Sequence, residues 1–389
     1  MKKVLLCSAL LMATNAFALR WDPSNNPSNM TRIAKGPMLT TFSDLPLAAT
    51  LTDNRYAWSE TYWPSNLGGI AYRWNHPDPQ PFKYHLNTKE ELKAMSQAQL
   101  AQLSPAELYD IAQGDYNYTL TRKVLSQFTT HDLWWEGICH GWSQGAANYP
   151  EPAPVVVTNR DGIQVPFGSS DVKGLIAMHE AFNFGGTSGF VGKRCAVRGK
   201  VPGEEDPRDG QVPIPSPEDY NSPACSDMNA GAFHVVTANM IGIYSRSFVA
   251  DIDRLNDVWN QPIYGYESAI KSEEPVTPEQ RLTGVERRVR VTTKFTYGEE
   301  LKFWSAEFAA QGLHNFVSKE PVTGTIHQEF RHKDYEYILE LDGAGKIIGG
   351  EWVTETRPDF MWIFERAPKF KNGRMPLAGL NAIYRPVRR

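Results

Sequence analysis

Cysteine is scarce in this chain, which has four in 389 residues, and no two of them have the C-x-x-C spacing of zinc or redox motifs. The H-E-x-x-H pattern of zinc hydrolases and the glycine-rich loops that bind phosphates are also missing. Beyond the first 18 residues there is no apolar run long enough to span a bilayer. We therefore expect no metal-dependent catalysis and no transmembrane anchor.

The chain also lacks a large excess of charge, since its formal net charge is −4. A nucleic-acid-binding protein would need a basic surface, so no nucleic-acid partner is expected. The first residues have the pattern of a secretory leader: Lys2 and Lys3, an apolar run over 4–13, and the small-x-small site Ala16-Phe17-Ala18. We predict a signal peptide over residues 1–18 and a secreted or periplasmic mature protein.

Removal of this leader takes away Cys7 and leaves Cys139, Cys195 and Cys225, an odd number for an oxidising compartment. Cys195 and Cys225 flank a segment rich in proline, glycine and acidic residues, with little apolar content. A disulfide closing this loop is worth about 3 to 4 kcal/mol by the loop-entropy relation. We predict this bridge and a free thiol at Cys139. The alternative, a bridge from Cys139 to either of the others, would exclude thiol catalysis.

Helix signals come first along the chain and strand signals afterwards. Capping patterns start at Asn87 and at Ser104, and helices are also expected over 119–128, from Cys139 to Ala147, and over 171–182. Strand patterns follow over 233–243, 247–253, 289–297, 335–341 and 346–353. This order indicates an α+β fold.

With 41% hydrophobic residues, the chain can bury one large core or two ordinary ones. We divide it into the signal peptide (1–18), an aromatic-rich N-terminal segment (19–85), a catalytic core (86–270) and a C-terminal β-rich region (271–389). The last region is either separate from the core or continuous with it.

The most informative stretch runs from Trp134 to Ser143 and places Cys139 between tryptophans. Gly137 allows a sharp turn, after which Cys139 can begin a helix whose first N–H groups and dipole favour a thiolate. A buried structural cysteine is the alternative. A nucleophilic thiol needs a base and an orienting acid. His234, expected at the start of a strand, and Asp251 on the next strand can supply them, with Asp253 as the alternative acid.

Several motifs in one order resemble the transglutaminase elicitor family of oomycetes and marine bacteria. They are Tyr62-Trp63-Pro64, residues 109–115, Trp135-Glu136-Gly137-Ile138-Cys139-His140-Gly141-Trp142, and the segment Val258, Trp259, Asn260, Gln261 and Pro262. The last is similar to the short surface peptide that plants sense in that family, although Ile263-Tyr264 depart from it. The resemblance implies a papain-like thiol fold and protein-glutamine γ-glutamyltransferase activity, with Cys139, His234 and Asp251 as the catalytic set.

The implied reaction joins a glutamine-bearing protein to a lysine or other amine through a thioester on Cys139. The oxyanion would be bound by the Cys139 N–H and an indole of Trp134 or Trp135, and Trp142 belongs to the same aromatic cluster. The chemistry needs no cofactor, and the sequence has no EF-hand spacing that would indicate Ca²⁺ dependence. A papain-like protease or amidase, and a non-enzymatic secreted binding protein, are the rival interpretations.

Overall fold

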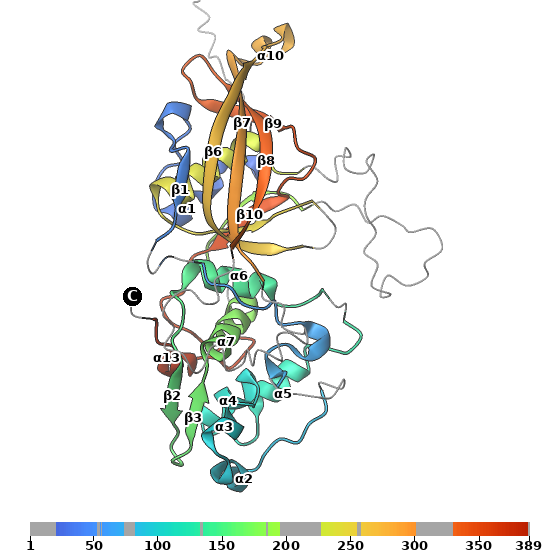
Figure 1. Cartoon of the computed structure of the whole chain (residues 1–389), viewed down its shortest axis with the longest axis vertical. Coiled ribbons are helices and arrows are strands. Elements are labelled where there is room, and N and C mark those ends of the chain that lie inside the picture. The colour runs from blue at the N-terminus through green and yellow to red at the C-terminus, as the bar shows by residue number, and fades with distance from the viewer. Residues whose placement is uncertain are drawn as a thin grey trace, which may run out of the picture.

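An antiparallel sheet lobe and a helical lobe stack along the long axis of the molecule, with helix α6 (Cys139–Asn148) at their junction (Figure 1). The computed structural model describes residues 21–52, 55, 57–73, 82–132, 135–183, 186–194, 227–254, 258–300 and 330–387. The expected signal peptide, Trp134, and the expected Cys195–Cys225 disulfide lie outside these residues. Within them, no helix has the length and apolar character that crossing a membrane requires.

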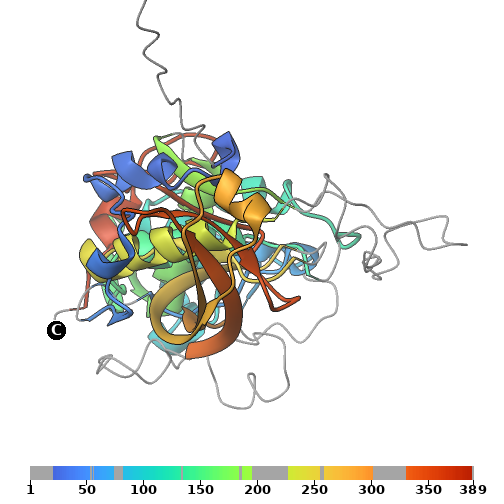
Figure 2. The same cartoon turned by 90° about the horizontal axis from the view of Figure 1, so that it is seen from above.

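The sheet lobe is built on strands in the order β4-β10-β5-β6-β7-β8-β9, all antiparallel, with the short β1 paired to β6. Seen from above, the long strands curl around helix α9 (Ala230–Thr237) (Figure 2). The other bounds are β1 Ala48–Thr50, β4 Ser188–Gly192, β5 Val249–Asp251, β6 Asn260–Glu274, β7 Arg287–Gly298, β8 Phe330–Leu341, β9 Ile347–Trp352, β10 Phe360–Phe364, η1 Pro23–Asn25, η2 Pro27–Met30, α1 Thr31–Ala34, η3 Phe42–Asp44, η9 Ala238–Ile243 and α10 Pro278–Leu282.

The helical lobe packs short helices around α6 and α7 (Ser169–Phe182). Ser104 and Glu107 form the predicted capping box at the start of α4, and Asp110 accepts hydrogen bonds from the first N–H groups of α5. The bounds are η5 Ser65–Leu67, η6 Gly69–Ala71, α2 Lys89–Ala94, α3 Gln97–Leu100, α4 Pro105–Ala112, α5 Thr119–Leu125, β2 Val155–Thr158, β3 Gln164–Phe167 and α13 Leu380–Ile383.

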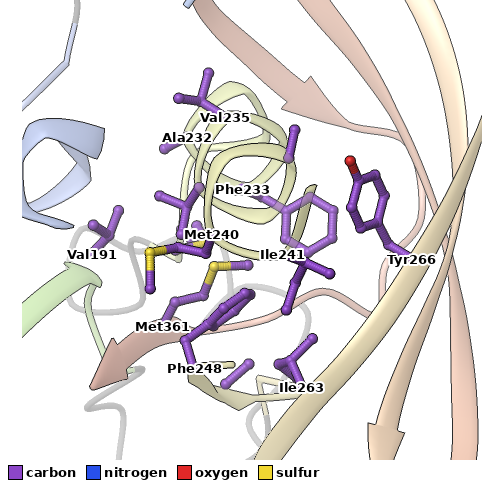
Figure 3. Close-up of a cluster of buried hydrophobic side chains, with 14 of the residues drawn as sticks. Val191, Ala232, Phe233, Val235, Met240, Ile241, Phe248, Ile263, Tyr266 and Met361 are labelled. Atoms are coloured by element: carbon purple, nitrogen blue, oxygen red, sulfur yellow. The ribbon is translucent and has the colours of Figure 1, made fainter. Parts of the chain in front are cut away.

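Each lobe has its own hydrophobic core. In the sheet lobe, Phe233 of α9 and Met240 of η9 lie near Ile263 of β6, Met361 of β10 and Phe248, which precedes β5 (Figure 3). In the helical lobe, Trp58, Trp63 and Trp142 are fully buried together with apolar residues of α4, α5 and α7. Burial of this apolar surface is the main source of stability for both lobes.

The mixture of helices and antiparallel strands confirms the predicted α+β class. Strands were correctly expected at β5, β7, β8 and β9, and helices at α5, α6 and α7. Helix α2, the first that the sequence predicted, begins one residue later than expected, because Thr88 and Glu91 form its capping box instead of Asn87 and Glu90.

The expected strand over 233–243 is wrong, because these residues form α9 and the π-helical η9. The segment is almost continuously apolar and buried, so its pattern does not distinguish a core strand from a core helix. The helix is set locally by Asn229, whose side chain accepts hydrogen bonds from the N–H groups of Gly231 and Ala232.

The expected domain boundaries do not follow the two cores. Residue 270 lies inside β6, so no break separates 86–270 from 271–389 there. Residues 19–85 are shared, since Leu51 belongs to the sheet core and Trp58 to the helical core. The end of the chain, from Phe370 to Ile383, returns to the helical lobe.

Helix α6 is held against α7 through Gly141. A Cβ atom on this residue would lie 2.1 Å from the carbonyl oxygen of Ala177, which is backbone and cannot move aside without shifting a helix. We predict that Gly141→Ala lowers the free energy of unfolding by about 1 to 3 kcal/mol or more, as overpacking does. Denaturant titration measures this loss.

Gly343→Ala is the matched control, because its Cβ would meet only Glu286 at 3.7 Å. It should be close to neutral. Equal stability of the two variants would contradict the close packing of α6 on α7.

Candidate active site around Cys139

Backbone pairing places Cys139 at the first turn of α6. The Ile138 N–H donates to the Tyr62 carbonyl at 2.8 Å, and the Ser65 N–H donates to the Glu136 carbonyl at 2.8 Å. Gly137 fits between these bonds because it has no side chain: a Cβ would lie 2.4 Å from the Tyr62 carbonyl oxygen. These contacts fix the backbone just before Cys139, where α6 begins. The sharp turn that Gly137 predicted is therefore present.

The Cys139 thiol is half-buried and free, and it faces the start of β6. Its sulfur lies 3.8 Å from the Val258 carbonyl oxygen and 3.8 Å from Nδ2 of Asn260, which donates to it. Burial, and then the negative charge of Glu300, raise the pKa of the thiol to about 12, although the Asn260 hydrogen bonds oppose this. The resting thiol is therefore protonated.

Asn260 is held in place by the indole of Trp362, whose Nε1 donates to Oδ1 of Asn260 at 2.7 Å. This bond fixes the amide orientation, so that the NH₂ group points at the sulfur. The pairing of β5 with β6 sets Asp251 directly opposite Asn260. Directly paired residues have side chains on the same face of a sheet, so the carboxyl of Asp251 lies on the Asn260 side.

Asp251 is fully buried, and its Oδ1 accepts the Trp259 N–H at 3.1 Å. Its Oδ2 has no hydrogen-bond partner. Burial, followed by the charges of Asp359 and Asp253, raises the pKa of Asp251 well above its usual value. Residues 258–260 therefore contact Cys139 and Asp251 in turn, which brings these two predicted residues to one place.

Glu300 adds a second carboxyl that the sequence analysis did not select. It forms a parallel bridge with Glu60, two residues before Tyr62, and its Oε1 is buried without a hydrogen-bond partner. Burial, with the neighbouring charge of Glu299, raises the pKa of Glu300 to about 8. Its charge acts on both Cys139 and Tyr62. No sequence motif marked this residue, because its closeness to the thiol arises only from the pairing with residue 60.

His234 is not at the thiol, and its expected role as the base is wrong in this structure. It lies on α9 rather than at a strand end, and its Nδ1 is hydrogen bonded to the Tyr337 hydroxyl at 2.8 Å. It makes no hydrogen bond with Cys139 or Asp251. Burial lowers the pKa of His234 to about 4, so the imidazole is neutral in the core.

His179 and His140 do not take the place of His234 as a base for Cys139. The imidazole of His179 is bound between Glu180 and the Lys371 N–H, deep in the helical lobe. His140 follows the thiol on α6, where burial lowers its pKa, and its ring has no hydrogen bond to another residue that the structure describes. Among the residues that the structure describes, no histidine hydrogen bonds to Cys139. Asp253, the alternative acid, forms an ion pair with Lys333 at 2.9 Å.

The tryptophans near Cys139 differ in the hydrogen bonding of their indole N–H groups. Nε1 of Trp135 is buried without a hydrogen-bond partner, four residues before the thiol. Trp142 is fully buried and donates to the Trp58 carbonyl at 3.2 Å, so it is a core residue and not a free donor. Trp134 lies outside the described residues.

The segment that resembles a surface peptide, residues 258–262, forms a wall of this site. Asn260, Gln261 and Pro262 are buried at the start of β6, while Val258 and Trp259 are partly exposed. Trp259 meets the ring of Tyr62 edge-on at 6.3 Å. The resemblance to a surface peptide therefore falls on residues that are mostly packed beside Cys139.

Residues 141–145 also match the G-x-S-x-G pattern of serine hydrolases. Ser143 is buried inside α6, and its hydroxyl lies 3.4 Å from the His140 carbonyl. A nucleophilic serine would need an exposed strand-to-helix turn, which this position lacks. Within the described ranges, no group of three His, Cys, Asp or Glu side chains is arranged to hold a metal ion.

Comparisons with known proteins identify a family by sequence and a similar fold by structure. The family described as Transglutaminase elicitor matches residues 121–381. No curated protein matches the chain. The fold is similar to the crystal structure of the GP42 transglutaminase from Phytophthora sojae, with a TM-score of 0.58 and 20% sequence identity, over 93% of this chain and 99% of that chain. Because the family match covers well over half of its length, the chain belongs to the transglutaminase elicitor family.

Proposed function

We propose that the protein is a protein-glutamine γ-glutamyltransferase, a transglutaminase, with Cys139 as its nucleophile. The supporting observation is the half-buried free thiol at the first turn of α6, bound by the Asn260 amide beside the carboxyls of Asp251 and Glu300. A structural cysteine would not need polar groups directed at it from another strand. Membership of the family adds independent support.

The reaction runs in two steps. The Cys139 sulfur attacks the carboxamide carbon of a glutamine side chain, the thiol proton passes through a base to the departing ammonia, and a γ-glutamyl thioester forms. A lysine amine then attacks the thioester carbonyl, an isopeptide bond forms, and the thiol is regenerated. Water in place of the amine gives glutamate.

The base in this proposal is a carboxylate and not an imidazole. Glu300 is the better candidate, because its Oε1 is unpartnered and its pKa of about 8 lies near neutral pH. Asp251 has one oxygen committed to the Trp259 N–H, so we assign it to holding residues 258–260 against the thiol.

The oxyanion of the tetrahedral intermediate needs two donors. As the first residue of α6, Cys139 has a backbone N–H that no helical turn uses. The buried, unpartnered indole N–H of Trp135 is the second donor in this proposal. Such a group is costly to bury without a partner, which is understandable if the partner is the substrate oxygen.

Further parts of the proposal rest on sequence. We infer a papain-like arrangement, in which a thiol at a helix start meets an antiparallel sheet, and a secreted protein with a Cys195–Cys225 bridge. The substrates are a glutamine-bearing protein and a lysine or other amine. Sensing of residues 258–262 by plants would need these partly buried residues to become exposed.

The rivals are a thiol protease or amidase, which would use the same residues, and a non-enzymatic binder. Release of ammonia with incorporation of an amine into a glutamine-bearing protein separates the first from a transglutaminase. A thiol that resists every alkylating reagent would favour the binder.

Cys139→Ala should abolish amine incorporation, because no other group in the site can form the thioester. His234→Gln should lower stability, since it disturbs the bond to Tyr337 in the core, but should keep the turnover of the folded enzyme near normal. The measurement is amine incorporation per folded molecule, with circular dichroism as the control for folding. Loss of activity in folded His234→Gln would restore the imidazole as the base.

Activity should rise with pH through about 8, because Glu300 must lose its proton to act as a base and its folded pKa is raised to that value. Glu300→Gln should lower kcat/KM by about 10²- to 10⁴-fold and remove this limb of the pH profile. Glu299→Gln is the matched control. It removes a charge that raises the pKa of Glu300, so it should shift the limb to lower pH with little loss of rate. An unchanged limb in Glu300→Gln would exclude this base.

Trp135→Phe should lower kcat by about 10²- to 10³-fold with little change in KM, because an oxyanion donor acts in the transition state. The matched control is Trp142→Phe, which removes an indole hydrogen bond in the core. It should reduce stability and leave kcat per folded molecule intact. Similar kcat losses in both variants would argue against a special role for Trp135.

A further inference from the structure

A cleft at the seam of the two lobes is lined by three arginines. Its volume is about 410 Å³, and its walls come from the end of α6, the segment after η9 and the end of β10. Arg55, Arg246 and Arg366 all line it. The cleft lies at the opposite end of α6 from Cys139, which is about 15 Å for a ten-residue helix.

The side chains of these arginines contact backbone carbonyls and an aromatic ring. Arg55 donates to the Ser245 carbonyl at 3.3 Å, Arg246 donates to the Ile33 carbonyl, and the Arg366 guanidinium lies 4.6 Å from the centre of the Tyr149 ring. None of the three forms a salt bridge in the described part of the chain. The backbone carbonyls and the ring satisfy some of the donors but carry no full negative charge to balance the three guanidinium groups.

Like charges in the cleft repel one another. Burial, together with the charge of Arg55, lowers the pKa of Arg246, and Glu365 opposes this effect. Glu365 itself pairs with Lys35 at 3.6 Å, so its charge is shared with a fourth cation. Bringing arginines together without counter-ions costs stability, and a bound anion would remove that cost.

The end of a helix offers a simpler reason for cations at this place. The carbonyl end of α6 carries about half a negative charge, which favours basic side chains nearby. Three full positive charges exceed that partial charge several times over, and they still exceed it about twofold when the charge of Glu365 is added to it. The carbonyl end of α6 therefore does not account for the excess positive charge of the three arginines.

We propose that this cleft binds a multiply charged oxyanion, a phosphate or sulfate group. Guanidinium groups hold such oxygens in pairs of parallel hydrogen bonds, which lysines cannot do. Ser245 also lines the cleft, and its hydroxyl offers another donor. The cleft is larger than a bare phosphate or sulfate ion, so it can hold either the free ion or the same group as an ester on a sugar.

The test is calorimetric titration of the full chain at low ionic strength, where screening is weak. The probes are inorganic phosphate, inorganic sulfate, a sugar phosphate and a sulfated disaccharide, with sodium chloride at matched ionic strength as the blank. Arg55→Gln and Arg366→Gln, both at exposed residues, and Arg246→Gln should each weaken binding at least tenfold. Esters that bind tenfold more tightly than the inorganic ions would identify a sugar-linked group; equal affinities would identify the free ion.

Arg122→Gln is the matched control. Arg122 is exposed on α5, donates to the Asn117 carbonyl at 3.0 Å and lies outside the cleft, so this change removes the same charge elsewhere. It should leave affinity unchanged. Absence of binding to all four probes, or equal affinities for the cleft variants and the wild type, would overturn the proposal. Protection of Arg55 and Arg366 from an arginine-specific reagent by the bound anion provides a second measurement that does not depend on the variants.

Discussion

The position of the thiol depends on one close backbone contact, the approach of residues 136–138 to the Tyr62 carbonyl. Gly137 makes that contact possible, and Gly141 does the same where α6 meets α7. A side chain at either place would collide with backbone atoms, so the start of α6 would move. The geometry at Cys139 is thus set by two residues with no chemical role. This also explains why α6 lies at the junction of the two cores, with its first turn directed at β6.

The environment of the thiol differs from that of a thiolate paired with an imidazolium. The charges that act on it are those of Glu300 and Asp251, no histidine hydrogen bonds to it among the described residues, and its pKa is raised to about 12. Such a thiol stays protonated until a substrate arrives, which would protect it in an oxidising compartment because the thiolate is the reactive form. Burying the carboxyls of Asp251 and Glu300 costs free energy, and the burial of apolar side chains in the sheet core offsets this cost. Buried carboxyls with raised pKa values are frequent at functional sites.

Local patterns predicted most of the elements, because alternation and capping act over a few residues. The helix at Cys139, the strands from β7 to β9 and the capping box at Ser104 follow from such signals. Trp135, Asp251 and the segment around Asn260 were singled out from the sequence, but their arrangement around the thiol was not, because these residues meet through long-range pairing. Glu300 comes near through its bridge to Glu60, and Asn260 through strand pairing. His234 was misplaced because a buried apolar run has no period that separates helix from strand.

The central claim is that Cys139 forms a γ-glutamyl thioester. The most direct measurement is intact-protein mass spectrometry after rapid acid quench, with a glutamine-bearing peptide as the substrate and no amine present. The account predicts an adduct equal to the peptide mass minus ammonia, located on Cys139 by peptide mapping, absent from Cys139→Ala, and lost on addition of an amine. Ammonia release without any adduct on Cys139, or an adduct that persists in Cys139→Ala, would contradict it.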